Sequence, residues 1–378
     1  MPRIPALGFF VPFAIHGRTR STPETNHERN SSPASRQTKT KSTQFVTSVI
    51  FPFQPIKHCL SSIFAKRIAL PVKDIYDIIE EFERRPGQPL ALASLVRVVG
   101  SSYRRSGARM LICEDETRAG SLSAGCLEDE VALRAREVLL TGEPIVVSFD
   151  TQRRFGCAGR IDILVERISE TFFSHLAQNL AARRSCFVLT VFGQKNRGSR
   201  MFGVETNSDF EEEDQLIREI RPPIRLLIVG DGPDNRPFYS IGNLLGWQIT
   251  EIFDPNLLSI EPDDWTAAIV KYHNYGRDFA ALTKLLPMNL RYVGLIGPRK
   301  RRDQMMNHLL DLGVTVNAGF FAPAGLDLGA ETPEEIALSI VAEIQRVFAK
   351  ASGDSLRERK TPIHATLPRA AVPTISKP

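Results

Sequence analysis

Residues 224–238 read IRLLIVGDGPDNRPF, and this stretch decides the fold of the second half of the chain. Its apolar run leads directly into Gly230 and Gly232. Apolar residues then recur at helical spacing until Gly246, and a second apolar run, WQITEIFD, closes on Asp254. The pattern therefore predicts a strand, a glycine turn, a helix and a second strand that ends on an acidic residue.

These elements follow the order of a Rossmann βαβ unit. The dinucleotide fingerprint is incomplete, however, because Asn235 stands at its third glycine position. Asp231 and Asp234 also place two negative charges beside the turn that would hold a pyrophosphate. The sequence predicts a Rossmann-like parallel α/β domain with Gly230 and Gly232 at its ligand edge, and it argues against NAD(P) as the cofactor.

Two further segments of this domain carry polar residues after predicted strands. The run AAIVKYHNYGRDFAAL places His273 and Asp278 after an apolar stretch. The run RYVGLIGPRKRR places Arg299 and the three cations that follow it in a strand-to-helix turn after Gly297. Backbone N–H groups at such a turn favour an anion, and cations reinforce it. The alternatives are a loop-capping role for His273 and a solvated helix face for the cations.

The first half of the chain is organised around residues 100–166, where glycines and serines interrupt apolar runs beside two cysteines. Cys126 follows Gly125 and precedes the helical pattern LEDEVALRAREVLL, and Cys157 precedes the strand-like RIDILVE. A cysteine beside a glycine turn is more accessible than one in an apolar run, and its thiolate is both nucleophile and metal ligand. The alternative is that both cysteines are buried and structural.

Helical and strand-like patterns alternate around this stretch and predict an α+β domain. A helix is expected from residue 72 to Pro86-Gly87, and another over residues 170–182, with apolar strands between and after them. The predicted organisation is a basic disordered leader at 1–70, the α+β domain at 71–206, an acidic and proline-containing linker at 207–223, the Rossmann-like domain at 224–349 and a disordered tail at 350–378.

Charge separates the leader from the rest of the chain. Residues 1–70 hold ten Lys or Arg against Glu24 and Glu28, whereas the remainder is slightly acidic, which argues against a nucleic-acid partner. Faint signal-peptide and transit-peptide features are two explanations of the leader. We favour a third, a start assigned too far upstream, so that residues 1–70 are not part of the protein.

Cysteine usage and hydropathy indicate the compartment. Five cysteines, an odd number, are scattered along the chain and favour a reducing compartment over a disulfide framework. No apolar run approaches the ~18 residues of a membrane span. We expect a cytoplasmic protein without a membrane partner.

Four motifs together resemble the XdhC/CoxI family, whose members are accessory proteins of xanthine dehydrogenase and related molybdenum hydroxylases. They are GSSYRRSGARM at 100–110, SAGCLE at 123–128, GCAG at 156–159 and PAGLDLGAETPEE at 323–335. In each cysteine turn one glycine of the family pattern is replaced by alanine, Ala124 in the first and Ala158 in the second. The resemblance runs from residue 71 to about 348 and implies an XdhC/CoxI-type α+β domain followed by a Rossmann-like domain.

The resemblance also implies a function. The chain would be a carrier rather than an enzyme: it would bind molybdenum cofactor (molybdopterin), support its sulfuration by a cysteine desulfurase, deliver it to a xanthine dehydrogenase-like molybdenum hydroxylase, and self-associate. Cys126 and Cys157 would contact molybdenum. Other cofactor-binding candidates are Arg104, Arg109, Gly125, Gly230, Gly232, His273, Asp278, Arg299 and Asp327. The alternatives are an NAD(P)-dependent oxidoreductase that uses His273 as general acid or base, and a scaffold without cofactor.

Overall fold

The computed structural model describes residues 72–150, 159–202, 210–211, 213–360 and 363. The leader at 1–70 and Cys157 lie outside the described residues. Among the described residues no helix combines the length and apolar character needed to cross a membrane.

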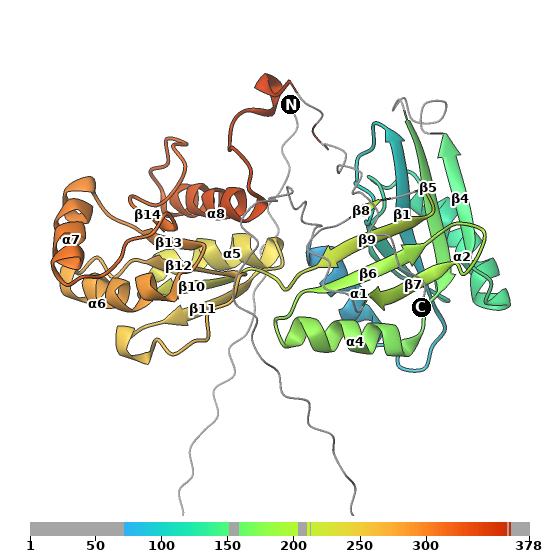
Figure 1. The fold of residues 1–378 in the computed structure, drawn as a ribbon, viewed down its shortest axis with the longest axis horizontal. Coiled ribbons are helices and arrows are strands. Elements are labelled where there is room, and N and C mark those ends of the chain that lie inside the picture. Colours follow the sequence, from blue (N-terminus) through green and yellow to red (C-terminus); the bar gives the residue numbers. More distant parts are fainter. Residues whose placement is uncertain (1–71, 151–158, 203–209, 212, 361–362, 364–378) are drawn as a thin grey trace, which may run out of the picture. The chain divides into compact units, whose positions relative to one another are not determined.

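The first domain contains a five-stranded antiparallel sheet in the order β3-β2-β1-β5-β4 (Figure 1). The longest strand, β1, lies at its centre and pairs with β2 and β5. The strands are β1 (Leu90–Gly100), β2 (Arg109–Cys113), β3 (Arg118–Gly120), β4 (Ile145–Asp150) and β5 (Gly159–Arg167). Helix α2 (Glu128–Thr141) packs on one face, because the apolar residues that recur along it contact the alternate residues of β1, β2 and β5.

A second antiparallel sheet of four strands, in the order β7-β6-β9-β8, belongs to the same domain. Its strands are β6 (Cys186–Val191), β7 (Gly198–Phe202), β8 (Phe210–Glu211) and β9 (Gln215–Ile220). Helices α1 (Val72–Glu83) and α4 (Glu170–Ala181) share a core with residues of both sheets. The expected helices and the α+β character are therefore present.

The structure corrects the expectation that residues 207–223 form a linker. β8 and β9 lie within it, and β9 pairs with β6 along its whole length, so the first domain continues through Ile220. The sequence did not indicate β9, because charged residues such as Arg218 and Glu219 are typical of a solvated segment. In the structure both side chains are buried. Glu219 accepts hydrogen bonds from Arg221, and Arg218 donates to Ser106.

The Rossmann-like domain is a parallel sheet in the order β11-β10-β12-β13-β14, which can be followed from bottom to top on the left of Figure 1. The strands are β10 (Arg225–Val229), β11 (Gln248–Ile252), β12 (Thr266–Val270), β13 (Tyr292–Leu295) and β14 (Phe320–Phe321). This order reverses direction between β10 and β12. In open parallel sheets, ligands bind beyond the carboxyl ends of the strands at such a switch point.

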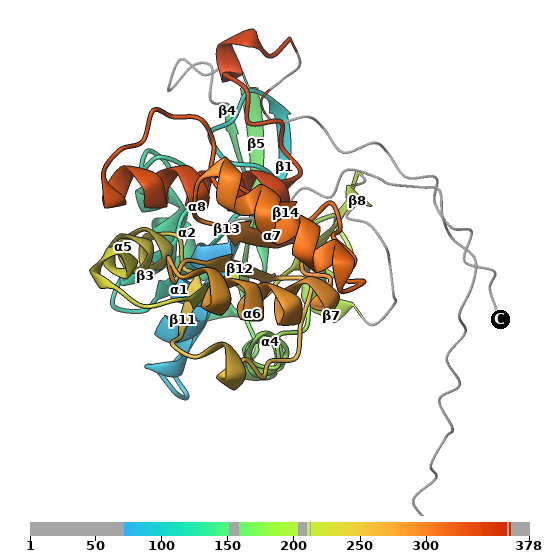
Figure 2. The ribbon, with the colours of Figure 1, turned by 90° about the vertical axis from the view of Figure 1, so that its left-hand side faces the viewer.

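Helices cover both faces of this sheet (Figure 2). The pair α5 (Arg236–Leu244) and α8 (Pro333–Ala349) packs on one face, and the pair α6 (Tyr275–Leu285) and α7 (Arg299–Asp311) packs on the other. A capping box begins α8: Thr332 Oγ1 accepts from the Glu335 N–H, and the Glu335 carboxylate accepts from the Thr332 N–H. After α8, residues 350–360 are exposed and form only the short turn Leu356–Glu358.

Candidate functional site

Cys126 lies on an exposed turn that leads into α2. The carboxylate of Glu128, itself buried, holds this turn from inside. It accepts hydrogen bonds from the N–H groups of Leu122 (3.2 Å), Ser123 (2.8 Å) and Leu127 (3.1 Å), and from the Ser123 hydroxyl (2.6 Å). The Cys126 thiol in turn lies 3.5 Å from Ser123 Oγ. Four donors on one carboxylate therefore fix the backbone that presents the thiol.

The electrostatics of Glu128 follow from these contacts. Burial raises the pKa of Glu128, but the hydrogen bonds from Ser123 and Leu127 outweigh it and bring the pKa below its ordinary value. The ionised carboxylate also takes up the Leu127 N–H, directly before the first residue of α2.

The alanine in the Cys126 turn causes no backbone strain. The left-handed conformation falls on Gly125, with φ of +106°, and Ala124 does not adopt a positive φ. A Cβ on Gly125 would meet no atom within 4 Å, so only the backbone conformation requires glycine there. The Ser-Ala-Gly-Cys variant is compatible with the turn.

The two arginines predicted beside Cys126 have internal partners. Arg104 donates to Ser121 Oγ at 2.6 Å and pairs with Asp74 of α1, so it ties the turn to that helix. Arg109 is 3% exposed and donates to the Gly107 carbonyl. Burial raises the pKa of the nearby Glu166, and the charge of Arg109 offsets part of that rise. Arg109, a cofactor-binding candidate in the sequence, is therefore buried within the first domain.

A second group of candidates meets at the switch point between β10 and β12. Lys271, which sequence reasoning missed, follows β12 directly and is fully buried. Its ammonium donates to Asn235 Oδ1 (2.6 Å), Asp234 Oδ1 (2.7 Å) and the Asp231 carbonyl (3.3 Å). The side chain runs alongside Gly230, where a Cβ would lie 2.8 Å from Lys271 Cγ. A lysine immediately after a fully apolar strand was the available signal.

The acidic glycine turn is less negative than its sequence indicates. Asp234 pairs with Lys271, and Asp231 pairs with Arg277 of α6 at 3.4 Å. Asn235, at the third glycine position, donates to Glu251 of β11. The sequence therefore overstates the repulsion that an anion would meet at this turn. It does not reveal the two neutralising cations, because both come from segments about 40 residues away in the chain.

His273 and Asp278 follow β12 but differ in accessibility. His273 is exposed, adopts φ of +55°, and places Nε2 3.9 Å from Asp234 Oδ2. Asp278 is fully buried, accepts from the Tyr272 N–H at 2.9 Å, and pairs with Arg301 of α7. The prediction that Asp278 supplies a ligand contact is therefore corrected: its carboxylate connects the loop after β12 to α7.

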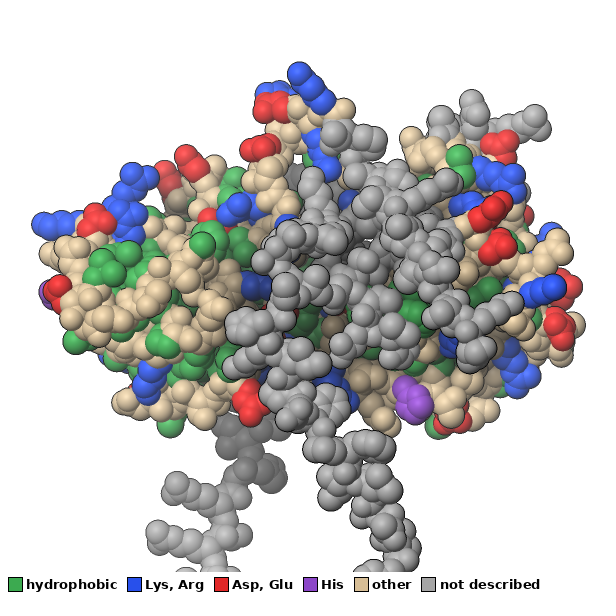
Figure 3. All heavy atoms as spheres, in the orientation of Figure 1, with side chains coloured by type: hydrophobic (Ala, Val, Ile, Leu, Met, Phe, Trp, Pro, Cys, Tyr) green, Lys and Arg blue, Asp and Glu red, His purple; other side chains and the backbone are tan. Residues whose placement is uncertain are grey.

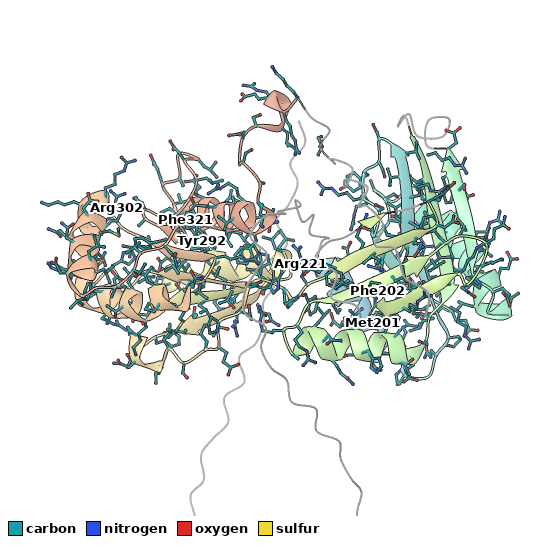
Figure 4. All side chains as sticks on the ribbon, viewed as in Figure 1. Met201, Phe202, Arg221, Tyr292, Arg302 and Phe321 are labelled. Atoms are coloured by element: carbon teal, nitrogen blue, oxygen red, sulfur yellow. The ribbon has the colours of Figure 1, made fainter. Side chains whose placement is uncertain are left out.

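The basic start of α7 divides into internal and exposed cations. Arg301 is engaged by Asp278, and Arg302 donates to the Ala322 carbonyl and Asp303. Arg299 and Lys300 are exposed. Lys and Arg side chains are visible over α7 in Figure 3, and Figure 4 labels Arg302 on this helix. The exposed pair is the part of the cluster that a ligand can reach.

Asp327 lies exposed on the loop between β14 and α8, and buried polar contacts hold that loop. Glu343 accepts from Tyr292 Oη at 2.7 Å and from the Gly325 N–H at 2.8 Å. Tyr292 also stacks on Phe321, with ring centroids 4.5 Å apart, and Figure 4 shows the two side by side. Gly325 has φ of +114°, and a Cβ there would lie 2.5 Å from Ser339 Oγ. The loop is thus anchored in the core.

The structure therefore places the predicted residues in two groups. Gly125, Cys126 and Arg104 lie around the turn before α2 in the first domain. Gly230, Gly232 and His273 lie at the switch point of the Rossmann-like sheet. Nearby, the buried Asp278 of α6 pairs with Arg301 of α7, the helix that begins with the exposed Arg299. Within the described residues no set of three or more His, Cys, Asp or Glu side chains has the arrangement of a metal site.

Both domains match known family models. Residues 226–344 match the XdhC Rossmann domain, and residues 83–150 match the XdhC and CoxI family. A protein named as a probable xanthine dehydrogenase subunit in Bacillus subtilis (strain 168) is 28% identical over 309 residues, which cover 67% of this chain and 91% of the relative. The molybdenum cofactor insertion chaperone PaoD from Escherichia coli (strain K12) is 24% identical over 71% of this chain and 86% of its own length.

A solved structure agrees with these matches. The crystal structure of a xanthine dehydrogenase from Bacillus halodurans superposes with a TM-score of 0.64 at 25% identity, and the match covers 75% of this chain and 98% of that one. The two family models match this chain within its first domain and its Rossmann-like domain, in that order. The chain belongs to the XdhC/CoxI family.

Proposed function

We propose that this protein is an accessory protein that binds molybdenum cofactor, supports its sulfuration by a cysteine desulfurase and delivers it to a xanthine dehydrogenase-type molybdenum hydroxylase. The observation that carries the proposal is the exposed Cys126 thiol on a turn fixed by four hydrogen bonds to Glu128. Two relatives support it, one named as a molybdenum cofactor insertion chaperone and one as a probable subunit of xanthine dehydrogenase.

The donor chemistry of Cys126 fits the metal of this cofactor. A thiolate is a soft ligand, and molybdenum in the cofactor is already held by sulfur from a dithiolene. When bound, the cofactor supplies the molybdenum centre that a hydroxylase uses for its chemistry. Glu128 would hold the Leu122–Leu127 backbone so that the Cys126 side chain stays outside the core, while Ser123 Oγ would accept a hydrogen bond from the thiol. Cys157 stays a prediction, since it lies outside the described residues.

The phosphate of the cofactor requires cations that have no internal partner. Arg104 and Arg109 are engaged within the first domain, and Glu128 takes up the Leu127 N–H before α2. Arg299 and Lys300 are exposed at the start of α7, where the helix dipole also favours negative charge. We infer that the phosphate is held at α7, with Asp327 and His273 as further polar contacts.

One observation favours a different class of protein. The exposed His273 lies near Asp234 at the switch point of the sheet, and such a pair would suit a general acid or base of an NAD(P)-dependent oxidoreductase. A change in NADH fluorescence on addition of the protein would support that alternative.

The carrier proposal predicts the metal content of the purified protein. From a host that makes the cofactor, the wild-type chain should carry molybdenum and pterin in equal amounts, and Cys126→Ala should carry at least about tenfold less of both, because the soft ligand is lost. Elemental analysis and pterin fluorescence measure this. Cys113→Ala is the matched control, since Cys113 is buried in the same domain and should leave the content unchanged.

The possible outcomes distinguish a wrong function from a wrong assignment of the site. Absence of both molybdenum and pterin from the wild-type chain would contradict the carrier function. Equal content in the wild-type chain and in Cys126→Ala would retain the function and remove Cys126 from the site.

A further inference from the structure

Lys271 is a completely buried cation whose partners all belong to the glycine turn. Its ammonium binds the Asp234 carboxylate, the Asn235 amide oxygen and the Asp231 carbonyl. A buried ammonium without a carboxylate partner is strongly unfavourable, so Lys271 requires an anion at this place. In the structure, Asp234 supplies that anion.

The carboxylate of Asp234 occupies the space over Gly232. A Cβ on Gly232 would lie 2.6 Å from Asp234 Oδ1 and 3.7 Å from Lys271 Nζ. In dinucleotide-binding turns, the corresponding glycine lets the pyrophosphate approach the backbone at the start of the following helix. Here Asp234 belongs to the short helical turn Pro233–Asn235, which runs directly into α5. The carboxylate and the ligand phosphate would therefore compete for one position.

We propose that Asp234 is a specificity-determining residue that makes the Rossmann-like domain reject NAD(P). Its carboxylate takes the place that a ligand phosphate takes in dinucleotide-binding turns, and Lys271 is its fixed counter-charge. This inference is independent of the proposed carrier function, because it rests only on contacts within the Rossmann-like domain. It predicts that a latent anion site opens when Asp234 is removed.

Three features oppose entry of a phosphate while Asp234 is present. The ligand would have to separate Asp234 from Lys271, and it would bring further negative charge against the displaced carboxylate. The buried Lys271 cannot follow the carboxylate outward, because its side chain is held against Gly230.

The test replaces Asp234 and supplies an anion. Asp234→Ala should lower the Tm of the Rossmann-like domain by roughly 5–10 °C, and millimolar inorganic phosphate should restore at least half of that loss. Thermal unfolding can be followed by tryptophan fluorescence, because both tryptophans, Trp247 and Trp265, lie in this domain and are buried. NADH fluorescence should report binding to Asp234→Ala and none to the wild-type chain.

Matched variants separate this effect from general salt stabilisation. Asp231→Ala removes an aspartate of the same turn whose partner Arg277 is partly exposed, and its Tm should respond to phosphate no more than that of the wild-type chain. Adding Lys271→Met to Asp234→Ala should abolish the phosphate response. If Asp234→Ala does not fold, Asp234→Asn, which keeps the side-chain size, should show a phosphate response larger than that of the wild-type chain.

Two results would overturn the proposal. The first is NADH binding to the wild-type chain as tight as its binding to Asp234→Ala. The second is a phosphate response of the Asp234 variants that equals the responses of Asp231→Ala and the wild-type chain.

Discussion

Asp278→Ala is expected to lower the free energy of unfolding of the Rossmann-like domain by about 3–5 kcal/mol, the range for breaking a buried ion pair by removing one partner. Asp278 is fully buried and pairs with Arg301, whose pKa is lowered by burial. Without the carboxylate, this poorly solvated guanidinium keeps no described acidic partner, and the Tyr272 N–H loses its acceptor. The loop after β12 and the start of α7 should then separate.

Urea unfolding followed by the fluorescence of Trp247 and Trp265 measures this effect, because both side chains are buried in the affected domain. Asp278→Asn keeps an acceptor for the Tyr272 N–H but not the charge, so its loss should be intermediate. Asp303→Ala is the control: Asp303 is exposed and pairs with Arg302 on the same helix, and it should change the stability by less than about 1 kcal/mol. Equal midpoints for Asp278→Ala and Asp303→Ala would disprove the role assigned to Asp278.

Glu128→Ala is expected to lower the stability of the first domain by about 2–4 kcal/mol at neutral pH, since it leaves three backbone donors and the Ser123 hydroxyl without their acceptor. The effect should depend on pH. The pKa of Glu128 in the folded chain lies below its ordinary value of 4.5, so its stabilisation is complete above about pH 4.5. As the pH falls through the folded pKa, the difference between wild type and variant should shrink.

Two buried cysteines of the first domain provide the measurement. Burial raises the pKa of Cys113 and of Cys186 to about 11, so neither thiol reacts readily while the domain is folded. Their labelling rates, resolved by peptide mass spectrometry, should rise in Glu128→Ala. Asp129→Ala, which removes an exposed acid of the same helical turn, should label as the wild-type chain does. A pH-independent difference would contradict the ionised role of Glu128.

Much of the fold follows from periodicity in the sequence. The helices α1, α2, α4 and α5 and the parallel order around Gly230 were predictable because apolar residues recur at the spacing of each element. The strand β9 was not, because its charged residues are buried and Arg218 has a distant partner: it donates to Ser106, which lies 112 residues earlier. Local pattern cannot reveal such a partner.

The candidate site was predictable in its residues but not in their roles. The exposed Cys126 has the accessibility that its glycine turn indicated. Arg109 and Asp278 were chosen for their charge, yet their burial makes them internal partners. Lys271 escaped notice because a single lysine after a strand carries no motif, and its importance arises only when β12 is placed beside the glycine turn.

The strand orders have a consequence for synthesis on the ribosome. In the first domain, β1 pairs with β5. The pairing partner of Leu92 is Glu166, which the ribosome adds more than 70 residues later. During that interval one edge of an apolar strand is unpaired, which exposes a nascent chain to misassociation. In the Rossmann-like domain, β12, β13 and β14 join the growing sheet one by one at the same edge. We therefore expect chaperone dependence during translation to concentrate in the first half of the chain.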